Sequence, residues 1–451
     1  MQTVFSQATV DMRRLSASSI SGRVRRINGV ALTAAGIAGH VGIGQRVRVE
    51  GRRHGVEGEV VAIDDGGCVT ILPFGTWLGV SAGDRVRVLE PGDDIHPDMS
   101  WLGCVVDGLG RPIASAPSLS EGLVPQPVHA APPNAFDRRR VGAKLETGLK
   151  AVDIFAPLCR GQRMGIFAGS GVGKSTMMSM LTRQVNADVI VIGLVGERGR
   201  EVQEFIQDDL GEEGMKRSVV VAATGDQSPL LRRQAAWTAT AIAEFFRDQG
   251  LQVLLMIDSV TRFAMAQREI GLAAGEPPTA KGYPPTVFSQ LPALLERSGP
   301  GADAAGDISA LYTVLVDGDE HNEPIADAVR GILDGHIVLD RAIAERGRYP
   351  AIDLQKSISR MLPECHGEAE RAIMEAARRS MAHYADKADM IQMGVYRPGS
   401  DRTTDTAIQF HGPSERFLAQ EKGEIADSAT AFAELYGLMI DAGLDVDIPG
   451  R

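Results

Sequence analysis

The run Ala168-Gly169-Ser170-Gly171-Val172-Gly173-Lys174-Ser175 decides the fold of this chain. It fits the phosphate-binding loop pattern, with alanine at the first position, where that pattern usually has glycine. Three glycines within five positions let the backbone curl so that successive N–H groups point at an anion. An apolar strand at 164–168 precedes the run, and a helix start at Thr176 follows it. The sequence therefore predicts that a nucleoside triphosphate binds here.

The loop ends in a lysine and a serine, and an acidic residue ends a separate apolar strand. Lys174 supplies a mobile positive charge for the β- and γ-phosphates, and Ser175 supplies a hydroxyl for Mg²⁺. The apolar run 253–257 leads into Asp258. A buried parallel strand would place this carboxylate at its carboxyl end, beside the loop, where it can orient Mg²⁺ and its waters. The Ser259 that follows also permits a turn or a helix cap.

A second apolar strand, at 189–195, leads into a charged motif around Glu197 and Arg198. Glu197 would lie at the same edge of the sheet, where a carboxylate can polarise a water in line with the γ-phosphate. Arg198 can pair with nearby acids or with the γ-phosphate. Taken alone, this motif also fits a charged surface loop.

Composition and charge describe a soluble globular chain that is not an evident nucleic-acid binder. The 451 residues carry a net charge of −11, with 44% hydrophobic and 23% charged residues. Residues 1–60 nevertheless hold nine arginines against four acids, which suits an acidic membrane surface, an acidic partner or a solvated face. The four dispersed cysteines lack metal-ligand spacing, and no run approaches the ~18 apolar residues of a membrane span. We expect a cytoplasmic protein without structural metal.

The chain divides into regions of different periodicity. Short β-rich runs between 21 and 89, separated by glycine-rich turns, predict a small β-barrel. From about residue 142, apolar strands alternate with helical patterns, which is typical of a parallel sheet with helices on both faces. The C-terminal ~80 residues have helical spacing. The predicted fold class is α/β, with boundaries at 1–20 (a partner-binding or flexible segment), 21–93 (barrel), 94–370 (P-loop domain) and 371–451 (helical domain).

A third motif carries a resemblance to a known family. The run Pro350-Ala351-Ile352-Asp353-Leu354-Gln355-Lys356-Ser357-Ile358-Ser359 meets every fixed position of the ten-residue signature of rotary ATP synthase α and β subunits. The chain resembles that family over nearly its whole length, which implies a RecA-like ATPase domain between the barrel and the helices. Residues 193–202 and 270–278 are similar to type III protein export ATPases. Residues 281–288, 322–327 and 330–336 are similar to their flagellar branch.

The resemblance implies a role for each matching residue. Glu197 would be the catalytic carboxylate that activates water, and Arg198 would sense the γ-phosphate. Tyr349 would stack on adenine, and Tyr396 would close the other side of that pocket. Arg360 would be an arginine finger that reaches the site of a neighbouring subunit. The implied phosphate, nucleotide and Mg²⁺ contacts are Ala168, Gly169, Ser170, Gly171, Val172, Gly173, Lys174, Ser175, Thr176 and Asp258.

The resemblance also implies cofactors and partners. ATP and Mg²⁺ would bind between the subunits of a homohexameric ring, because one chain carries both Glu197 and Arg360. The expected partners are regulatory and stalk-like proteins of the export apparatus, a membrane export gate and chaperone–substrate complexes. Contact with acidic lipids would be peripheral, at the cytoplasmic face of the inner membrane, and no nucleic acid is expected.

Several other functions stay open. A virulence-type secretion ATPase, or the catalytic subunit of a proton-translocating rotary ATPase, would share most of these motifs. A nucleotide-gated scaffold that hardly turns over would not need Glu197 and Arg360. A hexameric RNA translocase would need stacking aromatics in its N-terminal domain, whereas residues 21–89 contain only Phe74 and Trp77.

Overall fold

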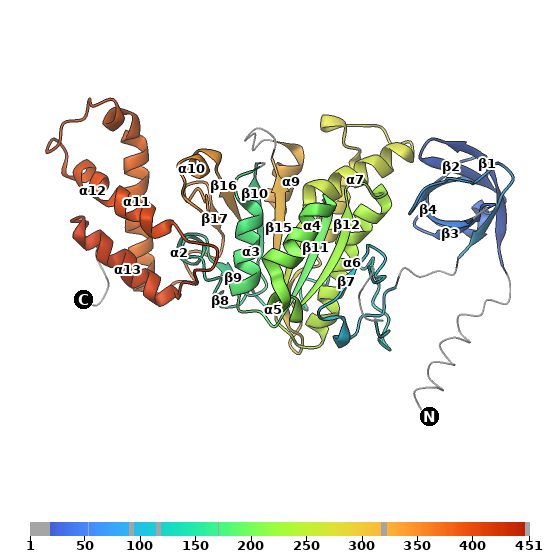
Figure 1. Cartoon of the computed structure of the whole chain (residues 1–451), viewed down its shortest axis with the longest axis horizontal. Helices are drawn as coiled ribbons and strands as arrows, with labels where there is room; N and C mark the ends of the chain where they lie inside the picture. Colours follow the sequence, from blue (N-terminus) through green and yellow to red (C-terminus); the bar gives the residue numbers. More distant parts are fainter. Residues whose placement is uncertain are drawn as a thin grey trace.

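The computed structural model describes residues 19–52, 54–89, 94–113, 119–169, 171–316 and 323–446. Three bodies lie in a row: a barrel at one end, a sheet with helices on both faces in the middle, and a group of helices at the other end (Figure 1). The predicted fold class is therefore confirmed. Most of the predicted N-terminal segment, residues 1–18, lies outside the described residues, and so does Ser170 of the loop.

The barrel closes six antiparallel strands in the order β1-β2-β5-β4-β3-β6. Alternation of residue type explains which side chains face inward: in β3, Val47 and Val49 are buried, whereas Arg46 and Arg48, which alternate with them, are partly exposed. The strands are β1 (Ser21–Asn28), β2 (Ala31–Ala35), β3 (Arg46–Glu50), β4 (Gly55–Ile63), β5 (Cys68–Pro73) and β6 (Arg85–Val88). The predicted boundary at residue 93 falls outside the described residues.

The central sheet has the order β17-β16-β10-β15-β13-β11-β12-β7, with β14 beside β15. From β16 to β7 every neighbouring pair is parallel, so the carboxyl ends of these strands share one edge. The strands are β7 (Val105–Val106), β10 (Arg163–Ala168), β11 (Val189–Glu197), β12 (Ser218–Thr224), β13 (Val253–Asp258), β14 (Gly299–Pro300), β15 (Asp307–Leu315), β16 (Gly335–Leu339) and β17 (Ile358–Ser359). A separate short ladder joins β8 (Lys144–Leu145) and β9 (Leu158–Cys159).

Alternate residues of the strands pack into two separate cores. On β11, Ile190 and Ile192 belong to the core with α2 and α3, whereas Val189 and Val191 belong to the core with the helices of the opposite face. The first face carries α2 (Lys150–Phe155), α3 (Lys174–Gln184), α4 (Gly199–Glu204) and α5 (Gly211–Lys216). The second carries α6 (Pro229–Asp248), α7 (Val260–Ala273), α8 (Pro285–Leu295) and α9 (Pro324–Ile332).

The C-terminal helices are α11 (Glu368–Gln392), α12 (Arg402–Leu418) and α13 (Ser428–Asp441), and the short α10 (Arg341–Glu345) precedes them. Phe410 and Phe432 share a hydrophobic core with Phe155 of α2, so these helices join the central body beside α2. The predicted boundary at 370 falls in the first turn of α11. None of the helices that the structure describes combines the length and apolar character needed to cross a bilayer.

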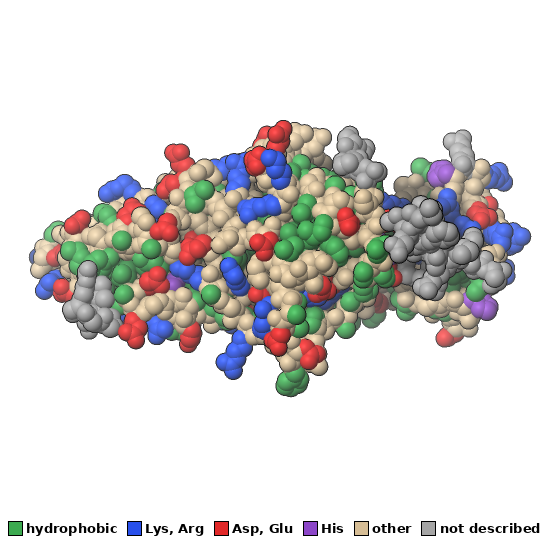
Figure 2. All heavy atoms as spheres, turned by 90° about the horizontal axis from the view of Figure 1, so that it is seen from below, with side chains coloured by type: hydrophobic (Ala, Val, Ile, Leu, Met, Phe, Trp, Pro, Cys, Tyr) green, Lys and Arg blue, Asp and Glu red, His purple; other side chains and the backbone are tan. Residues whose placement is uncertain are grey.

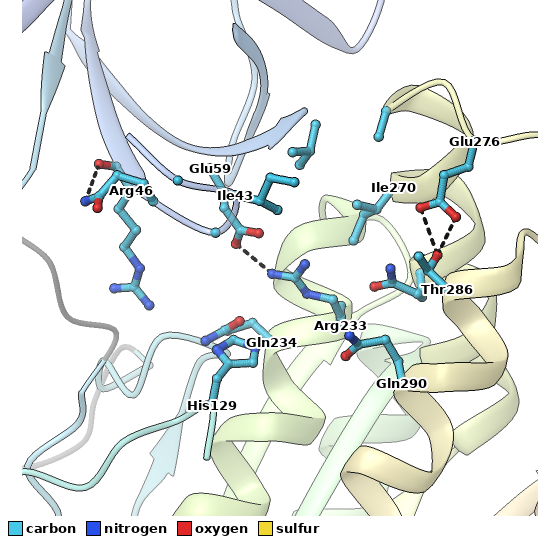
Figure 3. A pocket seen from close by; sticks show the side chains of 16 residues that line it. Ile43, Arg46, Glu59, His129, Arg233, Gln234, Ile270, Glu276, Thr286 and Gln290 are labelled. Carbon is cyan, nitrogen blue, oxygen red and sulfur yellow. Dashed lines mark hydrogen bonds and ion pairs between the residues drawn. The ribbon is translucent and has the colours of Figure 1, made fainter. Parts of the chain in front are cut away.

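A buried ion pair fastens the barrel to the central body. Arg233 Nη2 on α6 lies 2.6 Å from Glu59 Oε2 on β4, and the two residues are only 9% and 6% exposed (Figure 3). A small apolar cluster that includes Phe74 and Ile270 packs beside them. The adjoining pocket, about 540 Å³, opens between β4, α6, α7 and α8, and no described residue of the phosphate loop lines it. This junction is therefore separate from the predicted nucleotide site.

Candidate nucleotide-hydrolysis site

The phosphate loop connects the carboxyl end of β10 to the start of α3. Strand β10 ends at Ala168 and helix α3 begins at Lys174, as the motif predicts. Gly173 has a φ of 89°, and a Cβ atom there would lie 3.1 Å from Cδ1 of Tyr349. Glycine at this position therefore allows the left-handed turn and brings the predicted adenine-stacking ring against the loop.

Three charged residues of the predicted site meet at the carboxyl edge of the sheet. Glu197 is the last residue of β11, and Asp258 is the last residue of β13. Lys174 Nζ lies 2.5 Å from Asp258 Oδ1 and 3.6 Å from Glu197 Oε1. Strand β15 separates β13 from β10, and the long lysine side chain spans that gap. The parallel strand order thus brings together residues as distant in the sequence as Lys174 and Asp258, which are more than 80 positions apart.

Asp258 has further support from the strand between it and the loop. Thr313 of β15 donates a hydrogen bond of 2.6 Å from its hydroxyl to Asp258 Oδ1. Asp258 is 5% exposed, and Thr313 is fully buried. Two donors, Lys174 and Thr313, therefore fix one carboxylate oxygen of Asp258. Thr313 has no sequence signal, because a threonine in the middle of a strand is ordinary.

Glu197 lies in an environment that penalises its ionised form. Burial raises its pKa to about 7, the positive charge of Lys174 opposes that rise, and the negative charge of Asp258 adds to it. Its carboxyl also lies within hydrogen-bonding reach of Glu201, whose pKa is lowered by that bond. Oε1 of Glu197 is buried and has no hydrogen-bond partner among the described residues. A pKa near neutrality suits a group that must accept a proton at physiological pH.

An arginine that the sequence reasoning missed reaches Glu197. Arg262, in the first turn of α7, places Nε 3.3 Å from Glu197 Oε1. Gly196 has a φ of 72°, and a Cβ atom there would lie 2.8 Å from Arg262 Cδ. The glycine before Glu197 therefore leaves room for the arginine. The only available sequence signal was its position four residues after Asp258, which places it in the first turn of α7.

The donor set at this edge fits a divalent cation. Ser175 is exposed on the first turn of α3, and the buried Asp258 supplies a carboxylate oxygen. Hydroxyl and carboxylate oxygens, completed by phosphate oxygens and water, are the ligands that Mg²⁺ prefers. The buried Oε1 of Glu197 lies 3.6 Å from Lys174 Nζ, so it belongs to the same polar space.

Tyr349 borders a pocket of about 670 Å³ beside the loop. Tyr349 is 41% exposed, and the opposite wall is the segment 419–424 between α12 and α13. The backbone N–H of Gln420 donates to the carbonyl of Tyr349 at 2.8 Å, so this wall is fastened to the tyrosine itself. The sequence analysis did not identify Gln420, which lies 71 positions after Tyr349 and carries no motif.

Two predicted residues lie apart from this centre. Tyr396 is predicted to close the adenine pocket, but it does not line the pocket that Tyr349 borders. It lies between α11 and α12, with its hydroxyl 3.0 Å from the Asp405 carboxylate. Arg198 follows Glu197, but its side chain is 78% exposed and pairs with Glu201 at 3.1 Å. Arg198 therefore points to solvent in this single chain.

Arg360 lies at the edge formed by the amino ends of the parallel strands, whereas the loop lies at the edge formed by their carboxyl ends. It directly follows β17, and its backbone N–H donates to the carbonyl of Asp334, which precedes β16. Asp334 also pairs with Arg163 at the start of β10, so Arg360 is level with the amino end of that strand. The six residues of β10 separate the two edges by roughly 17 Å. The exposed guanidinium, which has no ion pair within the part of the chain that the structure describes, cannot reach the loop of its own chain.

Comparison with protein families gives two matches along the chain. The model described as "ATP synthase alpha/beta family, nucleotide-binding domain" matches residues 148–359, which include the loop, Glu197, Asp258 and Tyr349. The model described as "T3SS EscN ATPase C-terminal domain" matches residues 367–437, which correspond to α11, α12 and most of α13.

Individual proteins match over almost the whole length. The chain is 49% identical over 436 residues to the flagellum-specific ATP synthase of Caulobacter vibrioides, covering 95% of this chain and 97% of that protein. It is 46% identical to the flagellum-specific ATP synthase of Bacillus subtilis, covering 92% and 95%. Among solved structures, the assembled ATPase EscN of the enteropathogenic E. coli type III secretion system superposes with a TM-score of 0.87 at 38% identity, covering 93% of this chain and 100% of that one. EscN in complex with its central stalk EscO gives a TM-score of 0.83, also at 38% identity, with the same coverage of both chains.

Proposed function

We propose, from the premise that this chain belongs to the ATP synthase α/β family and to its flagellum-specific branch, that hydrolysis of Mg²⁺-ATP by this chain energises flagellar protein export. The chain is an ATPase of the type III export class. The observation that carries the proposed chemistry is the lysine of the phosphate loop, held between Asp258 and a buried Glu197 at one edge of the sheet.

The polar groups at that edge account for binding of the triphosphate. The N–H groups of the loop and the amino end of α3 attract the phosphates. When a triphosphate is bound, Lys174 would pair with the phosphate oxygens in place of Asp258. Ser175 and Asp258 would hold Mg²⁺, which supplies positive charge to offset the charge that develops on the phosphate oxygens. Tyr349 would stack on the base in the pocket beside the loop.

The acid–base step falls to Glu197. In its ionised form it accepts a proton from the water that attacks the γ-phosphorus, and a pKa near 7 leaves a large fraction ionised at neutral pH. Arg198 is proposed to turn from solvent to the γ-phosphate when that group is present. Together these residues provide a base and a charge sensor on adjacent positions of one strand end.

A further positive charge, which stabilises the phosphate oxygens during hydrolysis, is proposed to come from a second copy of the chain. Arg360 is exposed at the edge of the sheet that faces away from the loop, so a head-to-tail contact would carry it into the neighbour's site. A closed ring, six-membered by family resemblance, would make each interface equivalent. A stalk-like protein is a proposed partner because EscN has been solved with its central stalk EscO.

The finer partners and the location are also proposals. Chaperone–substrate complexes and a membrane export gate would receive the energy of hydrolysis, and this role would place the chain at the cytoplasmic face of the inner membrane. Acidic lipids are proposed as peripheral contacts of the arginine-rich barrel region. Figure 2 shows acidic and basic side chains interspersed over the visible face, which is unlike the single-sign surface of a nucleic-acid binder.

The test combines an isosteric variant with complementation. Glu197→Gln should lower Mg²⁺-ATP hydrolysis by roughly 10²–10⁴-fold while nucleotide binding is retained, because only the proton acceptor is lost. Glu204→Gln, on the exposed α4 helix, is the matched control and should keep its activity. Substantial turnover by the glutamine variant at 197 would contradict the proposed chemistry.

The flagellar role is tested in Caulobacter vibrioides that lacks its own flagellum-specific ATP synthase. The wild-type chain should restore swimming, and Glu197→Gln should not. Virulence-type secretion is the alternative that a specific observation favours, since the C-terminal match is to EscN. An active ATPase that fails to restore swimming would support virulence-type secretion. The sequence identities favour the flagellar role, because identity is 49% to the Caulobacter vibrioides protein and 38% to EscN.

A further inference from the structure

The pocket at the junction of the barrel and the central body is a cavity that the proposed function does not use. It has a volume of about 540 Å³, and side chains of the barrel and of α6, α7 and α8 line it (Figure 3). Pockets that bind small molecules usually have volumes of about 300–1,000 Å³. Ile43 and Val61 of the barrel and Ile270 of α7 supply apolar wall. The junction pocket therefore has the size and the mixed lining of a small-molecule site.

Two glutamines that line this pocket carry buried oxygens without a hydrogen-bond donor. Gln234 on α6 is 1% exposed, and Gln267 on α7 is 7% exposed. The amide oxygen Oε1 of each is buried and accepts no hydrogen bond from the residues that the structure describes. A buried acceptor without a donor is unfavourable. The last side-chain torsion of glutamine is broad, so each amide can turn toward a donor placed in the pocket.

A buried guanidinium adds a donor to these two acceptors. Arg233 precedes Gln234 on α6, and its Nη2 donates to Glu59 Oε2 at 2.6 Å. Its Nε is also buried, but it donates to no residue within the described part of the chain. The pocket lining therefore combines two acceptors with one donor. A ligand that carries both N–H groups and a carbonyl oxygen, as an amide does, could give each of them a partner.

The charges of the arginines and acids that line the pocket balance. Arg233 and Glu59 pair with each other and are 9% and 6% exposed. Arg46 and Glu276 bring one charge of each sign to opposite sides of the pocket (Figure 3). The Glu276 carboxylate also accepts the hydroxyl of Thr286 at 2.8 Å. This balance favours an uncharged ligand, because an ion would lose its water without meeting a net opposite charge.

We propose that the junction pocket binds a small, uncharged molecule that bears amide groups, of the kind found in short peptides with blocked ends. The N–H groups of the ligand would donate to the oxygens of Gln234 and Gln267, and a ligand carbonyl would accept from Nε of Arg233. Small apolar groups of the ligand would pack against Ile270. The inference does not depend on the proposed function, because no described residue of the phosphate loop lines this pocket.

The first test is calorimetric titration of the full-length chain with N-acetyl-alanyl-alaninamide, which carries amide groups, methyl groups and no charge. We expect saturable binding with a Kd of about 1 mM or tighter. The analogue with a free carboxylate and the analogue with a free ammonium should each bind at least about tenfold more weakly. A charged analogue that binds as tightly as the neutral peptide would overturn the inference. The absence of saturable binding up to about 10 mM would also overturn it, since the pocket would then hold water only.

Variants of the chain locate the binding site. Gln267→Leu removes an amide that lacks a partner, so it should weaken peptide binding at least about tenfold without lowering the thermal unfolding midpoint. Gln249→Leu, at the exposed end of α6, is the matched control and should bind as the wild type does. Ile43→Trp places a bulky ring at a lining residue that is 74% exposed, so it should block the pocket in a folded chain. Wild-type affinity in both Gln267→Leu and Ile43→Trp would overturn the inference.

Discussion

Replacing Arg262 with glutamine tests whether Glu197 works as the ionised base. The guanidinium Nε lies 3.3 Å from Glu197 Oε1 and favours the charged carboxylate. An opposite charge at this range shifts a pKa by about 1–3 units, and Arg262 is 32% exposed, so solvent screening places the effect at the lower end, about one unit. The pKa of Glu197 should therefore rise from about 7 to about 8.

The consequence for the rate follows from the fraction ionised. A base must be deprotonated to act, so activity rises with pH through the pKa of Glu197. At pH 7 the ionised fraction falls from about one half to about one tenth when that pKa rises by one unit, which lowers kcat/KM about fivefold. Above about pH 9, Glu197 is ionised in both the wild-type chain and the variant, and the difference in kcat/KM should disappear.

The assay is kcat/KM for Mg²⁺-ATP measured from about pH 6 to about pH 9.5, because this parameter reports the ionisation of the free enzyme. Arg268→Gln, on the same helix and over the ring of Tyr283, is the matched control and should leave the midpoint unchanged. An unchanged midpoint for Arg262→Gln would refute the electrostatic argument. An equal loss of activity at every pH would show that Arg262 acts in some other way.

The remaining predictions concern the barrel junction and the nucleotide pocket. Glu59→Gln leaves Arg233 buried without a charge partner, and should lower the free energy of unfolding by about 3–5 kcal/mol in a denaturant titration; a loss below about 1 kcal/mol would contradict that account. Gly173→Ala places a methyl group against Tyr349 in a left-handed turn, and should weaken ADP binding at least tenfold in a displacement assay, about 1.4 kcal/mol. Gln420→Ala removes three hydrogen bonds that hold the pocket wall, and should raise KM for ATP; an unchanged KM would contradict this account of the wall.

The sequence was sufficient for the features that depend on local patterns. The glycine-rich loop between an apolar strand and a helix start predicted the β10–α3 junction, and apolar runs that end in Glu197 and Asp258 predicted their common edge. Parallel strands that are buried on both faces read as continuous apolar runs, so β11 and β13 were located from residue type alone. The short β-rich runs between residues 21 and 89, separated by glycine-rich turns, predicted the strands of the barrel in the same way.

Residues whose roles depend on tertiary register could not be predicted. Thr313 meets Asp258 only because β15 lies between β10 and β13, and strand order has no signature in a single sequence. Arg262 and Gln420 lie on a helix and a loop with unremarkable composition, and only the fold brings them to Glu197 and Tyr349. Tyr396 was assigned to the adenine pocket by resemblance alone, and in the structure it lies in the connection between α11 and α12, beside Asp405.

The central claim is that each site is shared between two copies of the chain, and mixing two inactive variants tests it most directly. Arg360→Ala should lose roughly 10³–10⁵ in turnover, and Glu197→Gln should be similarly inactive. When equal amounts are assembled together, about a quarter of the interfaces would pair an intact Glu197 with an intact Arg360, so about a quarter of the wild-type rate should return. Mixed assemblies of normal size that remain inactive, or an Arg360→Ala variant with wild-type turnover, would contradict the shared site.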